Sequence, residues 1–440
     1  MEKKAIVLCG GGAKGAYQIG ALKALNKVGY KYDIVTGTSV GALNGAFAVM
    51  GDIKKAENIW SKLDMEGIFS FNDKQKDISK SKSMAELTKN LIKSGESASY
   101  EPLLELIDKN VNEKKIRKSD IEYGFVTTEF KPLKKVEIFK GDIPYGQLKN
   151  YIMASAACYP YMKSFKINDK QFLDGGYFDN MPIDMALRKG ATDIVVIDLK
   201  GIGKLNKAND IPAKVTYVEC SQNLGGIMLF NKENNIRNIK LGYLDTLKAF
   251  NKLEGNLYSF RKGENIKASS IEDKIINITR KIFSSIPNAS SMEKLAEAQI
   301  KNCINNYYKN IYTIKSSALA MLEMTADIFK IDYLRTYTFK MLSDKVIVEA
   351  NKIKRSDKNL SLDIKKILES VLKVDKMSDV FKMYDKSKLV LFIKSIISKD
   401  KITQEDKKDI YMLSIAFPET VLAAIFLKAY EESKLINIKK

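Results

Sequence analysis

The sequence of 440 residues contains no histidine. A Ser-His-Asp triad is therefore impossible, and so is a metal centre with histidine ligands. Any general base in this chain has to be Asp, Glu, Lys, Tyr or Cys. This absence constrains catalytic hypotheses about the chain more than any other feature of its composition.

Cysteine is also scarce, and its four residues are spread along the chain: Cys9, Cys158, Cys220 and Cys303. No two of them have the spacing of a metal-binding or CxxC motif, so we expect no metal site. Sparse use of cysteine is typical of a reduced, cytoplasmic protein.

Long apolar runs are missing as well. The first apolar segment, residues 5–9, is too short for a secretory signal, and a glycine cluster follows it where a cleavage site would lie. The most apolar late segment, residues 411–430, contains Pro418, Glu419 and Lys428 and falls short of a membrane span. We therefore expect a cytoplasmic protein, at most peripheral at a membrane, with no signal peptide and no transmembrane helix.

Acidic residues are too few to balance the basic ones. The 53 Asp and Glu residues stand against 73 Lys and Arg residues, which gives a formal net charge of +20. Such a charge favours anionic partners, either nucleic acid or an acidic membrane surface. Because the basic residues are dispersed and match no known nucleic-acid-binding motif, we expect no nucleic acid partner and predict peripheral contact with an anionic membrane. The pattern does not indicate an oligomeric state.

Strand-like and helical segments alternate through about the first 200 residues. Apolar strand segments lie at 5–9, 33–36, 123–128, 136–139 and 192–199, and segments with helical spacing include 14–28 and Val40–Met50. This alternation predicts a mostly parallel sheet with helices on both faces, a three-layer α/β/α core.

The pattern changes at about residue 255, where strand segments become rare and helical periodicity takes over. One helical face carries Ile271, Ile275, Ile278 and Ile282, and another carries Ile364, Ile367, Leu368, Val371 and Leu372. We predict two domains: the α/β core at 1–255, and a mainly helical domain of unknown role at 256–440.

The first strand leads into the loop Gly10-Gly11-Gly12-Ala13-Lys14-Gly15, which opens a helix. Glycines let the backbone approach a ligand closely, and a helix start presents free N–H groups, so this loop suits an anion. One candidate is a dinucleotide pyrophosphate, because the loop fits G-x-G-x-x-G and Asp33 lies near the distance expected for a ribose-binding acid. The other is the oxyanion of acyl transfer. On this motif alone, the dinucleotide is favoured.

A second motif, Gly37-Thr38-Ser39-Val40-Gly41, reverses that preference. It fits G-x-S-x-G and lies between a predicted strand and the predicted helix Val40–Met50. This is the context of a nucleophile elbow, in which a sharp turn with small neighbours projects a serine hydroxyl at the start of a helix. A dinucleotide-binding protein has no need of this element.

A third motif, Asp174-Gly175-Gly176, follows a probable strand and exposes a carboxylate on a bare turn. Since the chain lacks histidine, a serine nucleophile needs another proton acceptor, and a carboxylate within hydrogen-bond reach can serve. Partial burial would raise its basicity.

These three motifs, in this order, resemble the bacterial-type patatin-like phospholipase family, whose members use a Ser-Asp dyad. The resemblance implies a patatin-like fold, with Ser39 as nucleophile, Asp174 as base and backbone amides of the Gly10–Gly15 loop as oxyanion hole. It implies a serine ester hydrolase that cleaves phospholipid or lysophospholipid through an acyl-enzyme, without a cofactor. The stretch from Ala154 to Ala157 is similar to the family's A-S-x-x-x-P, but Pro160 lies one place later, so no role is carried onto it.

Overall fold

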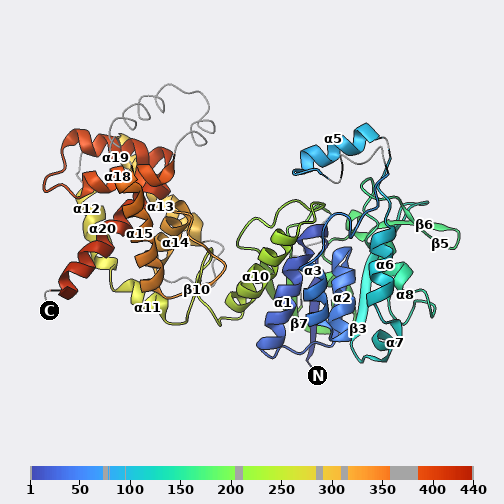
Figure 1. Ribbon diagram of the computed structural model, residues 1–440. Coiled ribbons are helices and arrows are strands. Elements are labelled where there is room, and N and C mark those ends of the chain that lie inside the picture. Colours follow the sequence, from blue (N-terminus) through green and yellow to red (C-terminus); the bar gives the residue numbers. More distant parts are fainter. Residues whose placement is uncertain are drawn as a thin grey trace. The chain divides into compact units, whose positions relative to one another are not determined.

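The computed structural model describes residues 2–72, 78, 80–94, 96–203, 212–283, 291–308, 316–356 and 385–438. The chain forms two compact units, Met1–Phe250 and Asn251–Lys440 (Figure 1). Each unit has its own buried apolar core. The expected domain division after residue 255 stays a prediction, because it concerns segments that would fold independently.

The first unit is built on a mostly parallel sheet, as the alternating pattern predicts. Its parallel strands lie in the order β3 (Glu122–Glu129), β2 (Ile34–Thr38), β1 (Lys3–Leu8), β7 (Ala191–Asp198) and β8 (Lys214–Glu219). Three further strands complete the sheet: β4 (Lys134–Phe139) and β6 (Lys170–Asp174) each pair antiparallel with β3, and β5 (Phe165–Ile167) pairs antiparallel with β6.

Both faces of this sheet are covered by helices, which confirms the three-layer core. Helix α2 (Val40–Met50) packs against β1, β2 and β3, and α1 (Ala16–Lys27) lies on the same side with α10 (Lys232–Ala249) along it (Figure 1). Helix α9 (Ile183–Arg188) packs against β1, β2 and β7. Because β1 is enclosed on two sides, its residues from Ala5 to Leu8 have no exposed surface, and this part of the strand is continuously apolar rather than alternating.

Shorter helices connect the strands of the first unit. They are α3 (Ile53–Trp60), α5 (Met84–Ser94), α6 (Glu101–Asn110), α7 (Glu113–Lys118) and α8 (Leu148–Ser155), together with 3-10 turns at Gly12–Gly15 and Gly175–Tyr177.

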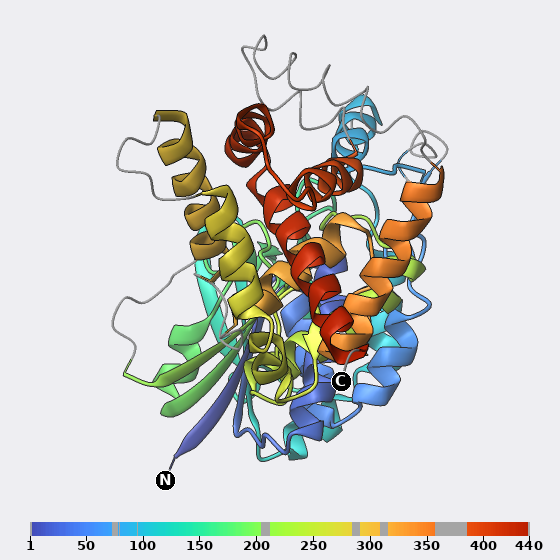
Figure 2. The same ribbon diagram turned by 90° about the vertical axis from the view of Figure 1, so that its left-hand side faces the viewer.

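The second unit is mainly helical. Its helices are α11 (Glu264–Ser269), α12 (Glu272–Ile282), α13 (Ser291–Tyr308), α14 (Ser317–Ile328), α15 (Phe339–Ser356), α18 (Lys386–Ile397), α19 (Gln404–Ala416) and α20 (Pro418–Ile438), and a small sheet pairs β9 (Ser259–Phe260) with β10 (Thr336–Tyr337). Helix α20, red in Figure 2, contacts α12, α13, α14, α18 and α19. The predicted apolar face of α12 is buried at Ile275, Ile278 and Ile282, whereas the second predicted face, Ile364 to Leu372, lies outside the described residues.

A buried carboxylate ties the start of the second unit to its core. Glu323 on α14 has no exposed surface and accepts the backbone N–H groups of Asn256, Leu257 and Tyr258 at 2.8, 3.1 and 3.2 Å. These three hydrogen bonds, with a fourth from the Tyr307 hydroxyl, compensate the cost of burying the charge.

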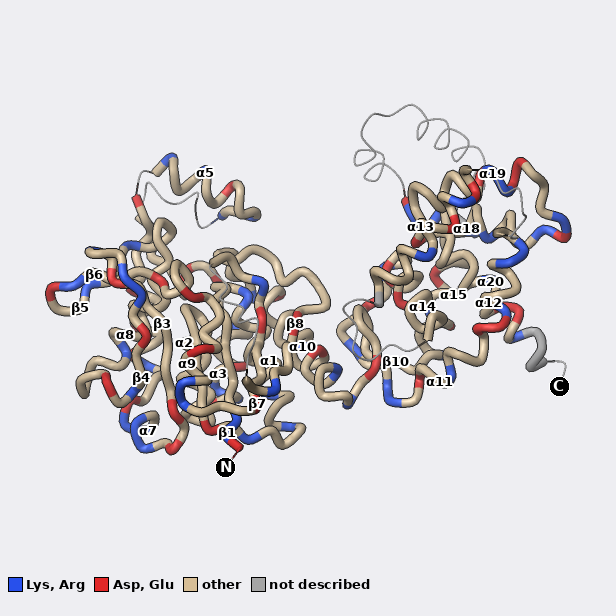
Figure 3. The backbone as a smooth tube through the Cα atoms, turned by 180° about the vertical axis from the view of Figure 1, so that it is seen from behind, with Lys and Arg blue, Asp and Glu red and all other residues tan. Residues whose placement is uncertain are grey.

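Charged residues of both signs are interspersed along both units (Figure 3). Residues 411–430, the most apolar late segment, are divided between α19 and α20 and packed into the core of the second unit. Among the described helices, none combines the length and apolar character needed to cross a membrane.

Candidate active site

Ser39 occupies a sharp turn between β2 and α2. Its backbone has φ 57° and ψ −125°, a conformation that costs a non-glycine residue energy and is typical of a nucleophile elbow. The turn fits only because its neighbours are small: a Cβ atom on Gly41 would lie 2.1 Å from the Leu8 carbonyl oxygen, and one on Gly37 would lie 2.5 Å from that of Gly41. The predicted strand–turn–helix context of Ser39 is therefore present.

A buried hydroxyl holds this turn in place. The Ser155 Oγ, at the end of α8, accepts the Ser39 backbone N–H at 3.0 Å and donates to the Val126 carbonyl oxygen of β3 at 2.6 Å. Ser155 has no exposed surface. The sequence places Ser155 in a recognisable stretch but does not reveal this function, because both of its partners are distant along the chain.

Asp174 reaches Ser39 because the strands that lead to them, β2 and β6, both pair with β3. On β3, Val126 pairs with Thr38 at the end of β2, and the next residue, Thr127, pairs with Asp174 at the end of β6. Since β4 occupies the other side of β3 over these positions, β6 lies on the same side as β2 and continues where β2 leaves the sheet. Two residues 135 positions apart, 174 − 39, are thereby brought to adjacent positions.

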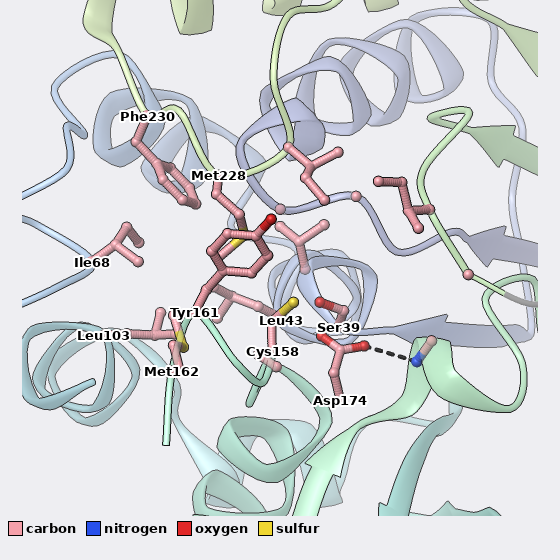
Figure 4. Close-up of a pocket in the computed structure, with 18 of the residues that line it drawn as sticks. Ser39, Leu43, Ile68, Leu103, Cys158, Tyr161, Met162, Asp174, Met228 and Phe230 are labelled. Atoms are coloured by element: carbon pink, nitrogen blue, oxygen red, sulfur yellow. Dashed lines mark hydrogen bonds between the residues drawn. The ribbon is translucent and has the colours of Figure 1, made fainter. Parts of the chain in front are cut away.

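The Asp174 carboxyl group is buried and points towards Ser39 (Figure 4). Its Oδ1 accepts the Gly176 backbone N–H at 2.8 Å. Burial raises the pKa of Asp174 from 3.8 to about 6, against the opposing effect of its hydrogen bonds with the Ser39 side chain and the Gly176 amide. A carboxylate with this pKa is ionised at neutral pH and is a better proton acceptor than an exposed aspartate.

The glycine loop lies beside Ser39, with Gly11 and Gly12 lining the same pocket. Gly12 has φ +54°, and a Cβ there would lie 2.0 Å from the Ile227 carbonyl oxygen, so only glycine fits. The backbone N–H of Ala13 donates to that oxygen at 2.7 Å, and the N–H of Lys14 donates to the Gly11 carbonyl oxygen at 3.2 Å.

The Lys14 ammonium group hydrogen-bonds the loop that follows β7. Its Nζ donates to the carbonyl oxygens of Leu199 and Lys200 at 3.4 and 3.1 Å. Lys14 thus fastens the glycine loop to a neighbouring loop.

Asn180, which sequence reasoning assigned no function, joins the glycine loop to the base loop. The Asn180 Nδ2 donates to the Gly10 carbonyl oxygen at 3.2 Å, and the backbone carbonyl oxygen of Asn180 accepts the Gly10 N–H at 3.2 Å. A Cβ on Gly176 would lie 3.1 Å from the Asn180 Oδ1, so the side chain also abuts the segment that follows Asp174.

These groups open onto a mostly apolar pocket of about 420 Å³ (Figure 4). The volume is within the ~300–1,000 Å³ typical of ligand sites. Its polar groups include Ser39 and Asp174, and its walls are formed largely by apolar side chains, among them Leu43, Phe47, Trp60, Ile68, Leu103, Met162, Met228 and Phe230. Such walls suit an aliphatic chain whose polar end is held at Ser39.

The predicted site residues divide into two groups. Ser39, Val40, Asp174 and Gly176, with Gly11 and Gly12, line the pocket, whereas Gly10, Ala13, Lys14, Gly15, Gly37, Thr38, Gly41 and Gly175 do not and act through the backbone or through packing. The Thr38 hydroxyl, for example, donates to the Asp179 carbonyl oxygen at 2.8 Å.

The geometry gives no support to a dinucleotide site. Asp33, the expected ribose ligand, precedes β2 and accepts the Lys4 backbone N–H at 2.9 Å, near the amino ends of β1 and β2. The Gly10–Gly15 loop follows the carboxyl end of β1, at the opposite edge of the sheet. In a dinucleotide-binding fold, the acid and the glycine loop lie at the same edge.

Comparison with known proteins gives one family match. Residues 6–187 match the family model described as patatin-like phospholipase. Curated relatives include patatin-like phospholipase domain-containing protein 7 of Mus musculus, 28% identical over 197 residues, which are 44% of this chain and 13% of the relative. Neuropathy target esterase sws of Drosophila melanogaster is 28% identical over 201 residues, 44% of this chain and 13% of the relative. Lysophospholipase nte1 of Aspergillus terreus is 28% identical over 203 residues, which are 45% of this chain and 12% of the relative.

The chain thus spans about 13% of the length of these relatives. Among solved structures, VipD from Legionella pneumophila matches with a TM-score of 0.35 and 15% identity, over 96% of this chain and 91% of that one. The type III effector ExoU matches with a TM-score of 0.31 and 11% identity, over 100% and 79%.

Proposed function

We propose that the chain is a lipid acyl hydrolase, because residues 6–187 of its first unit match the patatin-like phospholipase family model. The observation that carries the proposal is the pairing of Ser39 with a buried carboxylate, Asp174, at the polar end of an apolar pocket. Because no histidine exists in the sequence, Asp174 is the base that this pairing offers.

The proposed reaction has two steps. Asp174 accepts the proton of the Ser39 hydroxyl as its oxygen attacks the ester carbonyl, and the developing oxyanion lies beside the amides of Gly11 and Gly12. Asp174 then passes the proton to the departing alcohol, which leaves an acyl-enzyme. A water molecule gives its proton to Asp174 and attacks the acyl group, and that proton returns to Ser39 as the fatty acid departs.

The proposed oxyanion hole involves fewer residues than the whole Gly10–Gly15 loop. The N–H groups of Gly10, Ala13 and Lys14 already donate to protein carbonyl oxygens. Gly11 and Gly12 remain as the members of the loop that line the pocket beside Ser39.

The proposed substrate is a phospholipid or lysophospholipid. The apolar walls of the pocket support an acyl chain, and relatives of the first unit bear the names phospholipase and lysophospholipase. The net charge of +20 supports peripheral contact with anionic membranes, in line with a cytoplasmic protein that acts at a lipid surface.

The test is hydrolysis of defined lipids by the purified full-length chain. We expect fatty acid release from phospholipid or lysophospholipid, measured by mass spectrometry, and expect Ser39→Ala and Asp174→Asn to abolish it. Asp169→Asn is the matched control, because Asp169 is exposed on the same hairpin as Asp174. A fluorophosphonate probe should label Ser39, and wild-type turnover by the Ser39→Ala protein would refute the proposal.

A further inference from the structure

Exposed apolar side chains surround the mouth of the pocket. Ile202 is 79% exposed, Tyr159 48% and Tyr177 45%, and all three line the pocket that contains Ser39. We call these three residues the rim. Large apolar side chains that gather around an opening, rather than singly, indicate a surface that is covered in use.

The rim is assembled from separate segments that the fold brings together. Tyr159 follows α8, Tyr177 ends the 3-10 turn after β6, and Ile202 lies in the loop after β7. The Tyr177 hydroxyl donates to the Tyr159 carbonyl oxygen at 2.6 Å, which holds two of the three segments together. The rim is therefore a defined surface of the folded unit.

Basic side chains lie next to the rim in the sequence. Lys200 and Lys163 are exposed, two residues before Ile202 and four residues after Tyr159. Apolar groups flanked by cations are complementary to an anionic lipid surface, where the apolar groups enter the boundary of the acyl region and the cations meet the headgroups.

We propose that the rim is the surface with which this protein contacts an anionic lipid-water interface. The rim is continuous with the pocket, so an acyl chain moves from the lipid to Ser39 along apolar surface without crossing water. The delivery of an acyl chain to Ser39 rests on the proposed function, but binding of the rim to lipid is measurable without turnover.

The test compares partition onto vesicles of phosphatidylglycerol and phosphatidylcholine, using full-length Ser39→Ala protein as the parent. Ile202→Gln is expected to weaken co-sedimentation by about tenfold or more, the effect of withdrawing one large apolar side chain. Tyr145→Gln is the matched control, because Tyr145 is 75% exposed but lies against Arg117 of α7, which precedes the amino end of β3. It should change the partition less than twofold.

Three results would overturn the proposal. They are unchanged partition of the Ile202→Gln protein, equal losses for Ile202→Gln and Tyr145→Gln, and a dimer in ultracentrifugation that Ile202→Gln dissociates while vesicle binding persists. The last would assign the rim to a second copy of the chain. If the wild type hydrolyses no lipid but its vesicle binding still depends on Ile202, the proposed function fails and the rim stands.

A separate observation concerns Asn180. Besides its two hydrogen bonds to Gly10, Asn180 closely approaches two glycines. A Cβ on Gly10 would lie 2.1 Å from the Asn180 Oδ1, and a Cβ on Gly203 would lie 2.9 Å from the Asn180 Cβ. Asn180 is 2% exposed. It thus contacts the glycine loop, the segment after Asp174 and the loop after β7 together.

We infer that Asn180 is a positioning residue, which sets the Gly10–Gly12 backbone against Ser39 and Asp174. The Asn180→Asp variant keeps the shape but replaces the donor to the Gly10 carbonyl oxygen with a repelling oxygen. We expect kcat to fall by about 10²-fold with little change in KM, because a misplaced oxyanion site affects the transition state most. The added carboxylate should also raise the pH midpoint of activity, since it lies near Asp174.

Active-site titration with a fluorophosphonate separates positioning from folding. A merely structural role would reduce the fraction of sites that titrate but leave kcat per titrated site unchanged, and that outcome would overturn the inference. Asn168→Asp, at an exposed position of the β5–β6 turn, is the matched control and should change neither kcat nor the pH midpoint.

Discussion

The pH dependence of ester hydrolysis tests the buried carboxylate most directly. Burial raises the pKa of Asp174 to about 6, and only the ionised form accepts a proton from Ser39. A group with this pKa is about 10% ionised at pH 5 and about 90% ionised at pH 7. We therefore expect kcat/KM for a soluble ester to rise about tenfold between these pH values, with a midpoint near pH 6.

The composition makes this experiment unusually clean. Histidine is the side chain that ordinarily titrates near pH 6, and this chain has none. Burial raises the pKa of the nearby Cys158 thiol well above its ordinary value, so that thiol does not titrate in this range. A flat profile from pH 5 to pH 7, or a rise centred near pH 4, would show that the group controlling activity is not a buried carboxyl and would refute the reasoning.

The same ionisation predicts an effect on stability with a defined sign. The folded-state pKa of Asp174 lies above the ordinary value of 3.8, so its contribution to stability is complete below about pH 4 and is lost as pH rises through 6. The difference of about two pH units corresponds to about 3 kcal/mol. The Asp174→Asn protein should therefore be more stable than wild type at pH 7, but not at pH 4, in urea unfolding at the two pH values.

Further changes probe other parts of the molecule. Ser155→Ala removes the acceptor of the Ser39 N–H and should destabilise the first unit by about 1–3 kcal/mol in urea unfolding, because a buried donor is left unpaired; an unchanged midpoint would contradict this. Leu43→Trp fills part of the pocket and should shift the preferred ester towards shorter acyl chains in a p-nitrophenyl ester series; an unaltered chain-length profile would show that the acyl group lies elsewhere. Glu323→Gln replaces a charged acceptor of three N–H groups and should lower the stability of the second unit by roughly 3 kcal/mol. Hydrogen exchange at the Asn256 and Tyr258 amides measures this loss, and full protection at both would refute the role assigned to Glu323.

Local signals in the sequence predict much of the first unit. The apolar segment Val40–Met50 is a helix with the bounds expected from its pattern, and the G-x-S-x-G motif occupies the turn before it. These predictions succeed because strand length, turn glycines and helix periodicity are all local properties. The helical character of the second unit follows from the same kind of signal at Ile275, Ile278 and Ile282.

What the sequence does not disclose depends on contacts between distant residues. The hydrogen bonds of the Ser155 hydroxyl and the Asn180 amide cannot be predicted from the sequence, since their partners Ser39 and Gly10 lie more than a hundred residues away. The partners of the Lys14 side chain, carbonyl groups after β7, are likewise distant from it in the sequence. The small sheet formed by β9 and β10 has only two residues in each strand, too few for an alternating pattern.

The pairing of β6 with β3 leaves little tolerance for change in chain length. Along a strand, neighbouring side chains point to opposite faces, so sliding β6 by a single position against Thr127 would turn the carboxylate of Asp174 away from the serine. Residues added at the exposed turn around Asn168 and Asp169 should be accommodated, whereas one residue inserted between Phe172 and Asp174 should leave a folded protein in which Asp174 no longer faces Ser39. Evolution of this hairpin is therefore expected to vary its tip and to keep the length of β6 constant.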